Sequence, residues 1–286
     1  MWIGDDAAVL GRVGGPLVCT TDCTVAGVHG DPRVIGLADF GWRALARAVS
    51  DVAAMGARCD GAVVAVAGPP DTDLATLYDG IVAAAAGHGC PVVGGDLSGA
   101  AQLVVVVTVA GHVDAPPGPV LRSGARAGDA LFVTGPLGGA AAGLRWLSAG
   151  HDPPTGSDMA RAAAAHRHPW ARLDEGDAAR RAGASAMIDV SDGLLLDLSR
   201  LADASGVGFV LDTVPVAGAA TLEDALGGGE DYELVVAASD VGALCAAFAA
   251  DGLRSPARIG TCVENVATRT LAGEPTEPVG WRHRWD

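Results

Sequence analysis

The sequence predicts a two-lobed protein of the α+β or α/β class. Its 286 residues exceed the usual size of one domain, about 150 residues, and are enough for two hydrophobic cores. Apolar runs of strand length alternate with segments whose apolar residues recur at helical spacing, as in mixed α/β architectures. A segment rich in Pro and Gly at 114–119 is typical of a linker. We therefore expect one domain over residues 1–117 and a second over residues 118–286.

The first half of the chain is predicted to alternate strands and helices. Its longest expected helix has apolar residues at helical spacing, namely Leu37, Phe40, Ala44, Leu45, Ala48, Val52 and Met55. Asp73 is placed to cap a second helix after Gly68-Pro69-Pro70. Strands are expected at residues 17–21, 62–67, 91–93 and 102–112, and helices at residues 36–55 and 73–87.

The second half shows the same alternation. A strand at 130–134 is followed by a Gly-rich turn at 135–139 that opens a helix, and two helices are expected between residues 158 and 182. A strand at 186–188 ends in Asp189, and Asp192 begins the next helix. Further strands and helices are expected up to about residue 271.

All 19 basic residues are arginine, and 34 acidic residues bring the net charge to −15. A chain without lysine has neither the Walker A lysine nor the strand lysine of protein kinases, so phosphoryl transfer would need other groups. The negative charge argues against nucleic acid or an anionic membrane as a partner. No stretch has the length and hydrophobicity of a membrane span, and the N-terminus lacks a signal-peptide pattern. The six cysteines form no C-x-x-C pair, so we expect reduced, buried cysteines in a cytoplasmic protein.

Six short acidic motifs occur mostly where a hydrophobic run meets a turn or a helix start. They are Gly4-Asp5-Asp6, Thr20-Thr21-Asp22, Ser50-Asp51, Gly94-Gly95-Asp96, Asp189-Val190-Ser191-Asp192 and Gly229-Glu230-Asp231. Carboxylates fixed in this way can converge on one site, where close like charges are costly unless cations compensate them. Mg²⁺ prefers oxygen ligands and is usually shared between carboxylates and substrate phosphates. The motifs therefore predict chemistry with Mg²⁺ and a nucleotide.

Each motif also has an ordinary structural explanation. Asp51 can pair with Arg47 four residues earlier on the same helix, and Asp192 can cap the helix that it begins. Residues 135–139 can form a connecting turn or a phosphate-binding loop, although a P-loop lysine is absent. We favour a metal role for Asp51, because its helical neighbours are otherwise apolar.

A series of segments, in one order along the chain, resembles the thiamine-monophosphate kinase family, in the superfamily of aminoimidazole ribonucleotide synthetase and selenophosphate synthetase. The segments are GDDAAV at 4–9, TTD at 20–22, GVH at 27–29, SDVAAMGA at 50–57, GGD at 94–96, RSGA at 122–125, IDVSDGL at 188–194 and GGEDYEL at 228–234. The resemblance implies N-terminal and C-terminal domains like those of aminoimidazole ribonucleotide synthetase. It also implies direct, ATP-dependent phosphorylation of thiamine monophosphate to thiamine diphosphate, by a homodimer whose N-terminal strands pair across the interface.

The resemblance also implies roles for individual residues. The expected ligands of several Mg²⁺ ions are Asp6, Thr20, Thr21, Asp22, Asp51, Asp96, Asp189 and Asp192. The expected nucleotide contacts are Gly95, Asp96, Arg122 and Ser191. The expected substrate contacts are His29, Glu230 and Trp281. Asp51, Asp96 and Asp189 are the expected catalytic residues.

Two other functions stay open at this point. One is another ATP-using activity of the same superfamily, and the other is a catalytically silent relative that binds nucleotide or metal. Gly30 stands where the family often has an aromatic residue, and only three residues precede Gly4, where the family has a longer segment. The motif that contains Glu230 favours the thiamine enzyme.

Overall fold

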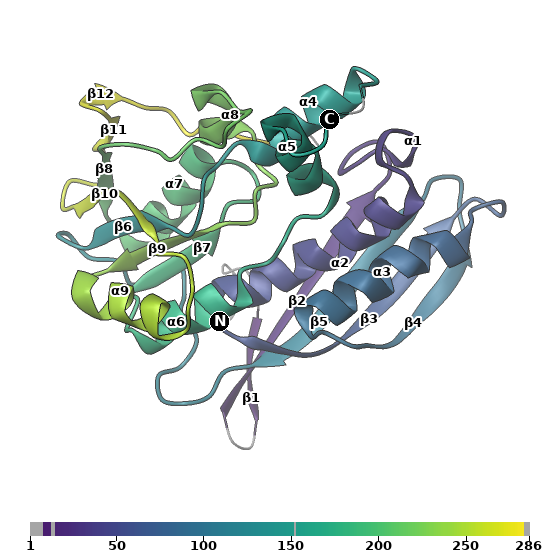
Figure 1. The fold of residues 1–286 in the computed structure, drawn as a ribbon. Coiled ribbons are helices and arrows are strands. Elements are labelled where there is room, and N and C mark those ends of the chain that lie inside the picture. The colour runs from purple at the N-terminus through teal and green to yellow at the C-terminus, as the bar shows by residue number, and fades with distance from the viewer. Residues whose placement is uncertain (1–7, 13–14, 152, 283–286) are drawn as a thin grey trace.

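The computed structural model describes residues 8–12, 15–151 and 153–282. It has the two lobes expected from the sequence, each built on its own sheet, and they lie side by side (Figure 1). The Gly4-Asp5-Asp6 motif, with the predicted metal ligand Asp6, lies outside the described residues. No helix in the described part of the chain is both long and apolar enough to cross a membrane.

The first lobe contains a five-stranded sheet in the order β1-β2-β5-β3-β4. Its neighbouring strands are antiparallel, except that β3 and β4 are parallel. The strands are β1 (Ala8–Arg12), β2 (Gly15–Val25), β3 (Arg58–Gly68), β4 (Val92–Gly99) and β5 (Val104–His112). The helices are α1 (Pro32–Ile35), α2 (Leu37–Ala54) and α3 (Leu74–His88).

Helices α2 and α3 cover one face of this sheet (Figure 1). Alternate residues of β5, such as Val105 and Val107, are buried under the helices, as the two-residue period of a strand requires. The helices pack closely because residue 80 is glycine. A Cβ at this position would lie 1.7 Å from the carbonyl oxygen of Ala38. Asp73 caps α3 as predicted, since its side chain accepts a hydrogen bond from the backbone N–H of Thr76.

The opposite face of the sheet, which we call the outer face, is largely apolar and open. Thr21, Cys23 and Ala65 are exposed there, and the side chain of Val63 is 44% exposed. Strand β4 is an edge strand, and Asp96 on it pairs with Ala65 and so lies on this face. The cysteines are free, as expected, but the prediction that they are all buried is wrong: only Cys90 and Cys262 are buried, Cys23 is exposed and the other three are half-buried.

The second lobe contains a seven-stranded mixed sheet in the order β12-β11-β8-β10-β6-β9-β7. Its strands are β6 (Ala130–Val133), β7 (Ala186–Asp189), β8 (Gly208–Leu211), β9 (Leu234–Ala238), β10 (Ala257–Val263), β11 (Arg269–Leu271) and β12 (Glu274–Pro275). Its helices are α4 (Gly139–Ser148), α5 (Asp158–Arg167), α6 (Leu173–Arg181), α7 (Leu194–Ser205), α8 (Leu222–Gly227) and α9 (Val241–Ala250).

This sheet is buried on both faces. Leu131 and Val133 of β6 pack in a core with α7, while Ala130 and Phe132 pack in a second core with α6 and α9. The sequences of the central strands are therefore continuous apolar runs rather than alternating apolar and polar residues.

Helix α2 belongs to both lobes. Its buried residues from Phe40 to Val52 lie mainly in the core of the first lobe, but Ala53 and Ala54 pack in the core shared with α6 and α9. Arg180 of α6, which is 3% exposed, reinforces this junction. Its guanidinium donates hydrogen bonds to the carbonyl oxygens of Gly56, Asp114 and Pro117. The linker between the lobes is thus tied to the end of α2.

Two predicted boundaries are wrong in ways that affect the site. The Gly94-Gly95-Asp96 motif is not a turn after a strand; it lies inside β4, where the backbone pairs with β3. Helix α7 begins at Leu194 with Gly193 at its N-cap, so Asp192 precedes the helix rather than capping it.

Candidate functional site

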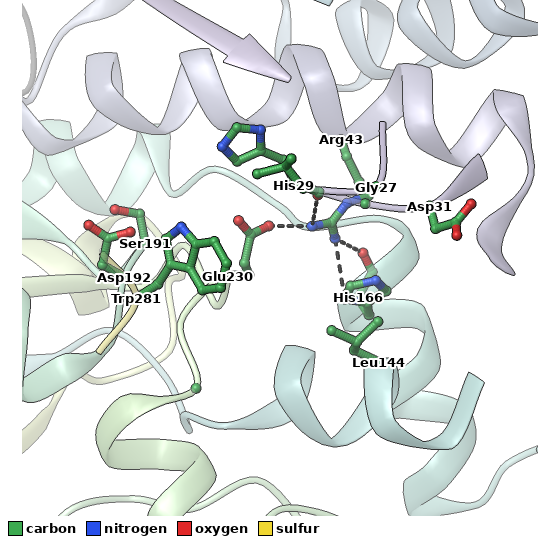
Figure 2. A pocket seen from close by; sticks show the side chains of 13 residues that line it. Gly27, His29, Asp31, Arg43, Leu144, His166, Ser191, Asp192, Glu230 and Trp281 are labelled. Carbon is green, nitrogen blue, oxygen red and sulfur yellow. Dashed lines mark hydrogen bonds and ion pairs between the residues drawn. The ribbon is translucent and has the colours of Figure 1, made fainter. Parts of the chain in front are cut away.

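A pocket of about 240 Å³ opens between the two lobes, as Figure 2 shows. The 27–31 loop and helix α2 form its wall on the first lobe. The second lobe contributes α4, α5, the 191–192 segment, the 228–230 segment and Trp281. The half-exposed indole of Trp281 lines it, and its backbone N–H donates to the carbonyl oxygen of Asp192. The predicted substrate residues His29, Glu230 and Trp281 therefore line one pocket.

A second, smaller cavity of about 190 Å³ adjoins this pocket, and we call it the acidic cavity. It shares His29, Ser191, Asp192, Glu230 and Trp281 with the pocket. Its remaining lining residues are Asp22, Arg47, Asp51, Asp189 and Tyr232. The structure thus brings together four carboxylates that the sequence predicts as metal ligands, from positions far apart in the chain.

Hydroxyl groups orient two of these carboxylates, those of Asp51 and Asp189. The hydroxyl of Thr20 on β2 donates to Oδ2 of Asp51 at 2.5 Å, across from the last turns of α2. The hydroxyl of Ser50 donates to Oδ2 of Asp189 at 2.6 Å, and Asp189 is only 2% exposed. Two adjacent residues of α2 therefore form hydrogen bonds to different lobes: Asp51 to Thr20 in the first lobe and Ser50 to Asp189 in the second.

Arginines neutralise the other two carboxylates. Nε of Arg47 donates to Oδ2 of Asp22 at 2.9 Å, and Arg200 of α7 lies 2.7 Å from Oδ2 of Asp192. The ion pairs of Arg47 go to Asp22 and Glu230, so the alternative that Arg47 pairs with Asp51 along the helix is wrong. The side chain of Asp51 turns toward Thr20 instead.

The backbone of the 229–232 segment is strained at the site. Glu230 and Tyr232 have φ values of 62° and 50°, in the left-handed region that few non-glycine residues adopt. Hydrogen bonds from their N–H groups to the carbonyls of Ser191 and Val190 hold this conformation. Backbone strain of this kind is common at functional sites and indicates a constrained position for Glu230.

Glu230 bridges two arginines that lie one turn apart on α2. Arg43, which is fully buried, donates to Oε2, and Nη1 of Arg47 donates to Oε1 at 2.9 Å. Burial would raise the pKa of Glu230, but Arg47 and Arg43 outweigh burial and hold that pKa below its usual value. The carboxylate is therefore ionised at neutral pH.

Arg43 also joins three parts of the pocket wall (Figure 2). Its guanidinium donates to the carbonyl oxygens of His29 and His166 as well as to Glu230. Burial, assisted by Arg43, lowers the pKa of His166 to about 3, so this imidazole is neutral. Sequence reasoning missed both residues. A charged residue between Phe40 and Ala44 on an apolar helix face was the available signal for Arg43.

Four other predicted residues lie away from the acidic cavity. Successive side chains of a strand point to opposite faces, so Thr21 points to the outer face while Thr20 points to the helices. The hydroxyl of Thr21 forms a hydrogen bond with that of Thr108. Asp96 is on β4, where it pairs with Ala65 of the neighbouring strand β3. Strand β4 lies three strand positions from β2, which is about 14 Å at the usual strand spacing. Gly95 neighbours it on this edge strand, and a Cβ there would lie 1.9 Å from the carbonyl oxygen of Val64.

Arg122 lies in the bend after the linker, close enough to Arg200 for the two positive charges to repel each other. Nearby, Asp197 accepts hydrogen bonds from the N–H groups of Ser191, Asp192 and Gly193. This carboxylate shapes the loop that holds two predicted ligand-binding residues. Within residues 8–12, 15–151 and 153–282, no three His, Cys, Asp or Glu side chains are grouped closely enough to hold a metal by themselves.

Comparisons with known proteins agree with this architecture. The family model of the AIR synthase related protein, N-terminal domain, matches residues 4–113, and that of the C-terminal domain matches residues 126–270. Hydrogenase maturation protein HypE shares the fold, with a TM-score of 0.69 at 20% identity over 91% of this chain and 83% of its own.

Thiamine-monophosphate kinases are much more similar. The enzyme of Mycobacterium tuberculosis is 39% identical over 274 residues, which cover 90% of this chain and 80% of that protein. The enzyme of Halobacterium salinarum is 34% identical over 98% of this chain and 94% of its own length. The solved structure of AaThiL complexed with AMPPCP and TMP superposes with a TM-score of 0.88 at 30% identity, over 99% of this chain and 92% of that one. The chain belongs to the thiamine-monophosphate kinase family.

Proposed function

We propose that this protein transfers the terminal phosphoryl group of ATP to thiamine monophosphate, yielding thiamine diphosphate and ADP. The observation that carries this proposal is the pocket that adjoins the acidic cavity through five shared lining residues. A similar structure was solved with AMPPCP and TMP, a nucleotide analogue and this substrate. The site thus has room for an organic ligand beside groups suited to phosphate chemistry.

The transfer is direct. An oxygen of the acceptor phosphate forms a bond to the terminal phosphorus of ATP, and the bond from that phosphorus to the bridging oxygen breaks, leaving ADP with the electron pair. The acceptor phosphate is ionised at neutral pH, so no strong general base is needed. Catalysis then depends on alignment and on compensation of negative charge.

In this proposal, His29, Glu230 and Trp281 contact thiamine monophosphate. The exposed ring of Trp281 offers an aromatic face to the positively charged thiazolium, an attraction that is strongest when the cation is partly desolvated. Gly95, Asp96, Arg122 and Ser191 contact the nucleotide.

Mg²⁺ fits the donor chemistry of the acidic cavity. Asp51 and Asp189 offer oxygen ligands there, with Asp22, Asp192 and Thr20 beside them. Mg²⁺ commonly takes only one or two protein carboxylates and completes its shell with water and phosphate oxygens, so a preformed cage is not required. When bound, the ions would neutralise phosphate charge. Asp6, Thr21 and Asp96 stay in the proposed ligand set.

We also propose that the protein is a homodimer that pairs its outer faces. That face exposes Val63 and Ala65 beside the edge strand β4, and an uncovered apolar sheet with an open edge strand favours association. A two-fold axis parallel to the strands would lay β4 of one copy over β2 of the other. Asp96 pairs with Ala65 and so lies on the outer face, and the Asp96 of each copy would then approach Thr21 on β2 of the other copy, which accounts for its distance from Asp22 within one chain.

Mixing two inactive variants tests this arrangement. Asp51→Ala and Asp96→Ala should each abolish turnover while the fold stays intact. If Asp96 acts across the interface, a randomly mixed dimer population should regain about one quarter of wild-type activity, because each heterodimer keeps one intact site. A mixture as inactive as its components would show that both aspartates act within one chain, and near-normal activity of both variants would remove them from the site.

The domain boundary at residues 117/118 and the cytoplasmic location belong to the same proposal. The boundary is supported by the end of β5 at His112 and the start of β6 at Ala130. The location is supported by the free cysteines.

The decisive experiment incubates the full chain with ATP, Mg²⁺ and thiamine monophosphate and separates the products chromatographically. We expect equal amounts of thiamine diphosphate and ADP. Folded protein that binds ATP but forms no thiamine diphosphate would instead support the silent relative, and ATP turnover without this acceptor would support another reaction of the superfamily.

A further inference from the structure

Arg47 places a positive charge in the wall of the acidic cavity. Among the described residues that line this cavity, it is the only arginine. Its side chain is 11% exposed, so it is mostly enclosed but open toward the cavity. Because the chain has no lysine, arginines must provide the protein's permanent positive charges near a bound phosphate.

Two carboxylates hold the guanidinium of Arg47 in place without using all of its donors. Nε and Nη2 donate to Oδ2 and Oδ1 of Asp22, at 2.9 and 3.4 Å, and Nη1 donates to Oε1 of Glu230 at 2.9 Å. A guanidinium carries five N–H groups in one plane, so one N–H on Nη1 and one on Nη2 are engaged by no residue in the described part of the chain. Such a pair matches two oxygens of a phosphate.

The partners of Arg47 come from both lobes, which fixes its orientation. Asp22 is on β2, and Glu230 is held by the strained 229–232 segment. Glu230 also lines the pocket proposed for thiamine monophosphate, and Arg47 stands where that pocket meets the acidic cavity. A donor held in place before the reaction needs no reorganisation as charge develops.

We propose that Arg47 is a catalytic residue that binds the phosphoryl group in transit from ATP to thiamine monophosphate through these two N–H groups. This inference rests on the proposed function. During the transfer, the moving group keeps negative charge on its three peripheral oxygens while one bond to phosphorus forms and the other breaks. Arg47 stabilises that charge in addition to what Mg²⁺ contributes, and no proton moves to or from it.

The competing role for Arg47 is that of a counter-ion for Asp22 and Glu230. Arg47→Gln separates the two roles when kcat and KM are measured at saturating Mg²⁺. We expect kcat to fall about 100-fold, as when one oxyanion donor is removed, with both KM values within about threefold of wild type. Arg181→Gln is the matched control, because Arg181 also pairs with two carboxylates, of Asp177 and Asp251, but on the surface. It should keep wild-type kcat.

A variant that keeps more than half of the wild-type kcat, with a changed half-saturating Mg²⁺ concentration alone, would overturn the inference and leave Arg47 as a counter-ion. If Arg47→Gln does not fold, Arg47→Lys decides, since it keeps the charge but cannot present two parallel N–H groups. We expect its kcat to be about tenfold below wild type, and an unchanged kcat would overturn the inference. Wild-type protein without turnover would overturn the proposed function and this inference together.

Discussion

Replacing Arg43 by methionine tests the network at the centre of the pocket. The substitution keeps the length of the side chain but removes hydrogen bonds to Glu230 and to the carbonyl oxygens of His29 and His166. Breaking a fully buried ion pair costs about 3–5 kcal/mol. Here the side chain of Glu230 is 26% exposed and keeps Arg47, so we expect about 2–4 kcal/mol.

This free energy converts into a measurable change in melting temperature. With 286 residues, the entropy of unfolding is about 0.6 kcal/mol per kelvin, so Tm should fall by about 3–7 °C. The KM for thiamine monophosphate should also rise, because His29 and His166 lose their common anchor. Scanning calorimetry and steady-state kinetics measure the two effects.

Arg58→Met is the matched control for Arg43→Met. The side chain of Arg58 is 67% exposed and lies 3.4 Å from Asp177, an arrangement worth at most about 1 kcal/mol. The control should therefore lower Tm by less than about 2 °C. Arg43→Met with a Tm and a KM indistinguishable from those of the control would refute the reasoning, since the network would then stabilise neither the fold nor the pocket.

Three further predictions concern single positions. Gly95→Ala should lower Tm by about 2–5 °C, because the added Cβ would lie 1.9 Å from the carbonyl oxygen of Val64, whereas Gly94→Ala, whose Cβ meets only a methyl group at 3.7 Å, should melt like wild type. Burial raises the pKa of Asp231 to about 7, so the fold binds its proton more tightly than the unfolded chain does, and this group lowers the free energy of unfolding as pH rises from about 4 to 7. Asp231→Asn should therefore flatten the decline in stability over that range in denaturant titrations, and an unchanged slope would contradict the assignment. Trp281→Ala should raise the KM for thiamine monophosphate about 5- to 30-fold with Tm nearly unchanged, since the indole is half-exposed and its proposed role is a cation–π contact with the substrate; an unchanged KM would remove the ring from the substrate site.

Local patterns in the sequence predicted the elements that position the site. The helical spacing from Leu37 to Met55 located α2 with Asp51 near its end, and the apolar run before Asp189 located β7. The two-residue period of a strand also argues against placing both threonines of the Thr20-Thr21-Asp22 motif in one site. Thr20 and Thr21 are neighbours on β2, so their side chains cannot both face the acidic cavity.

Long-range pairing is what the sequence could not provide. Nothing near Arg43 indicates that its partner is Glu230, which lies 187 residues further along the chain. The position of Asp96 depends on the order of strands, and no local pattern shows that β4 is the edge of the sheet. The partners of Arg47 likewise depend on how the two lobes meet, so a pairing with Asp51 was a reasonable but wrong alternative.

The passage of α2 through both cores limits how this molecule can move. A hinge rotation that separated the lobes would expose Ala53 and Ala54 and strip Arg180 of the carbonyl groups that it holds. Ligands are therefore expected to reach the open pocket while the lobes stay fixed. For the same reason, the lobes should not melt separately. A single calorimetric transition, with equal calorimetric and van't Hoff enthalpies, would be the signature of this shared helix.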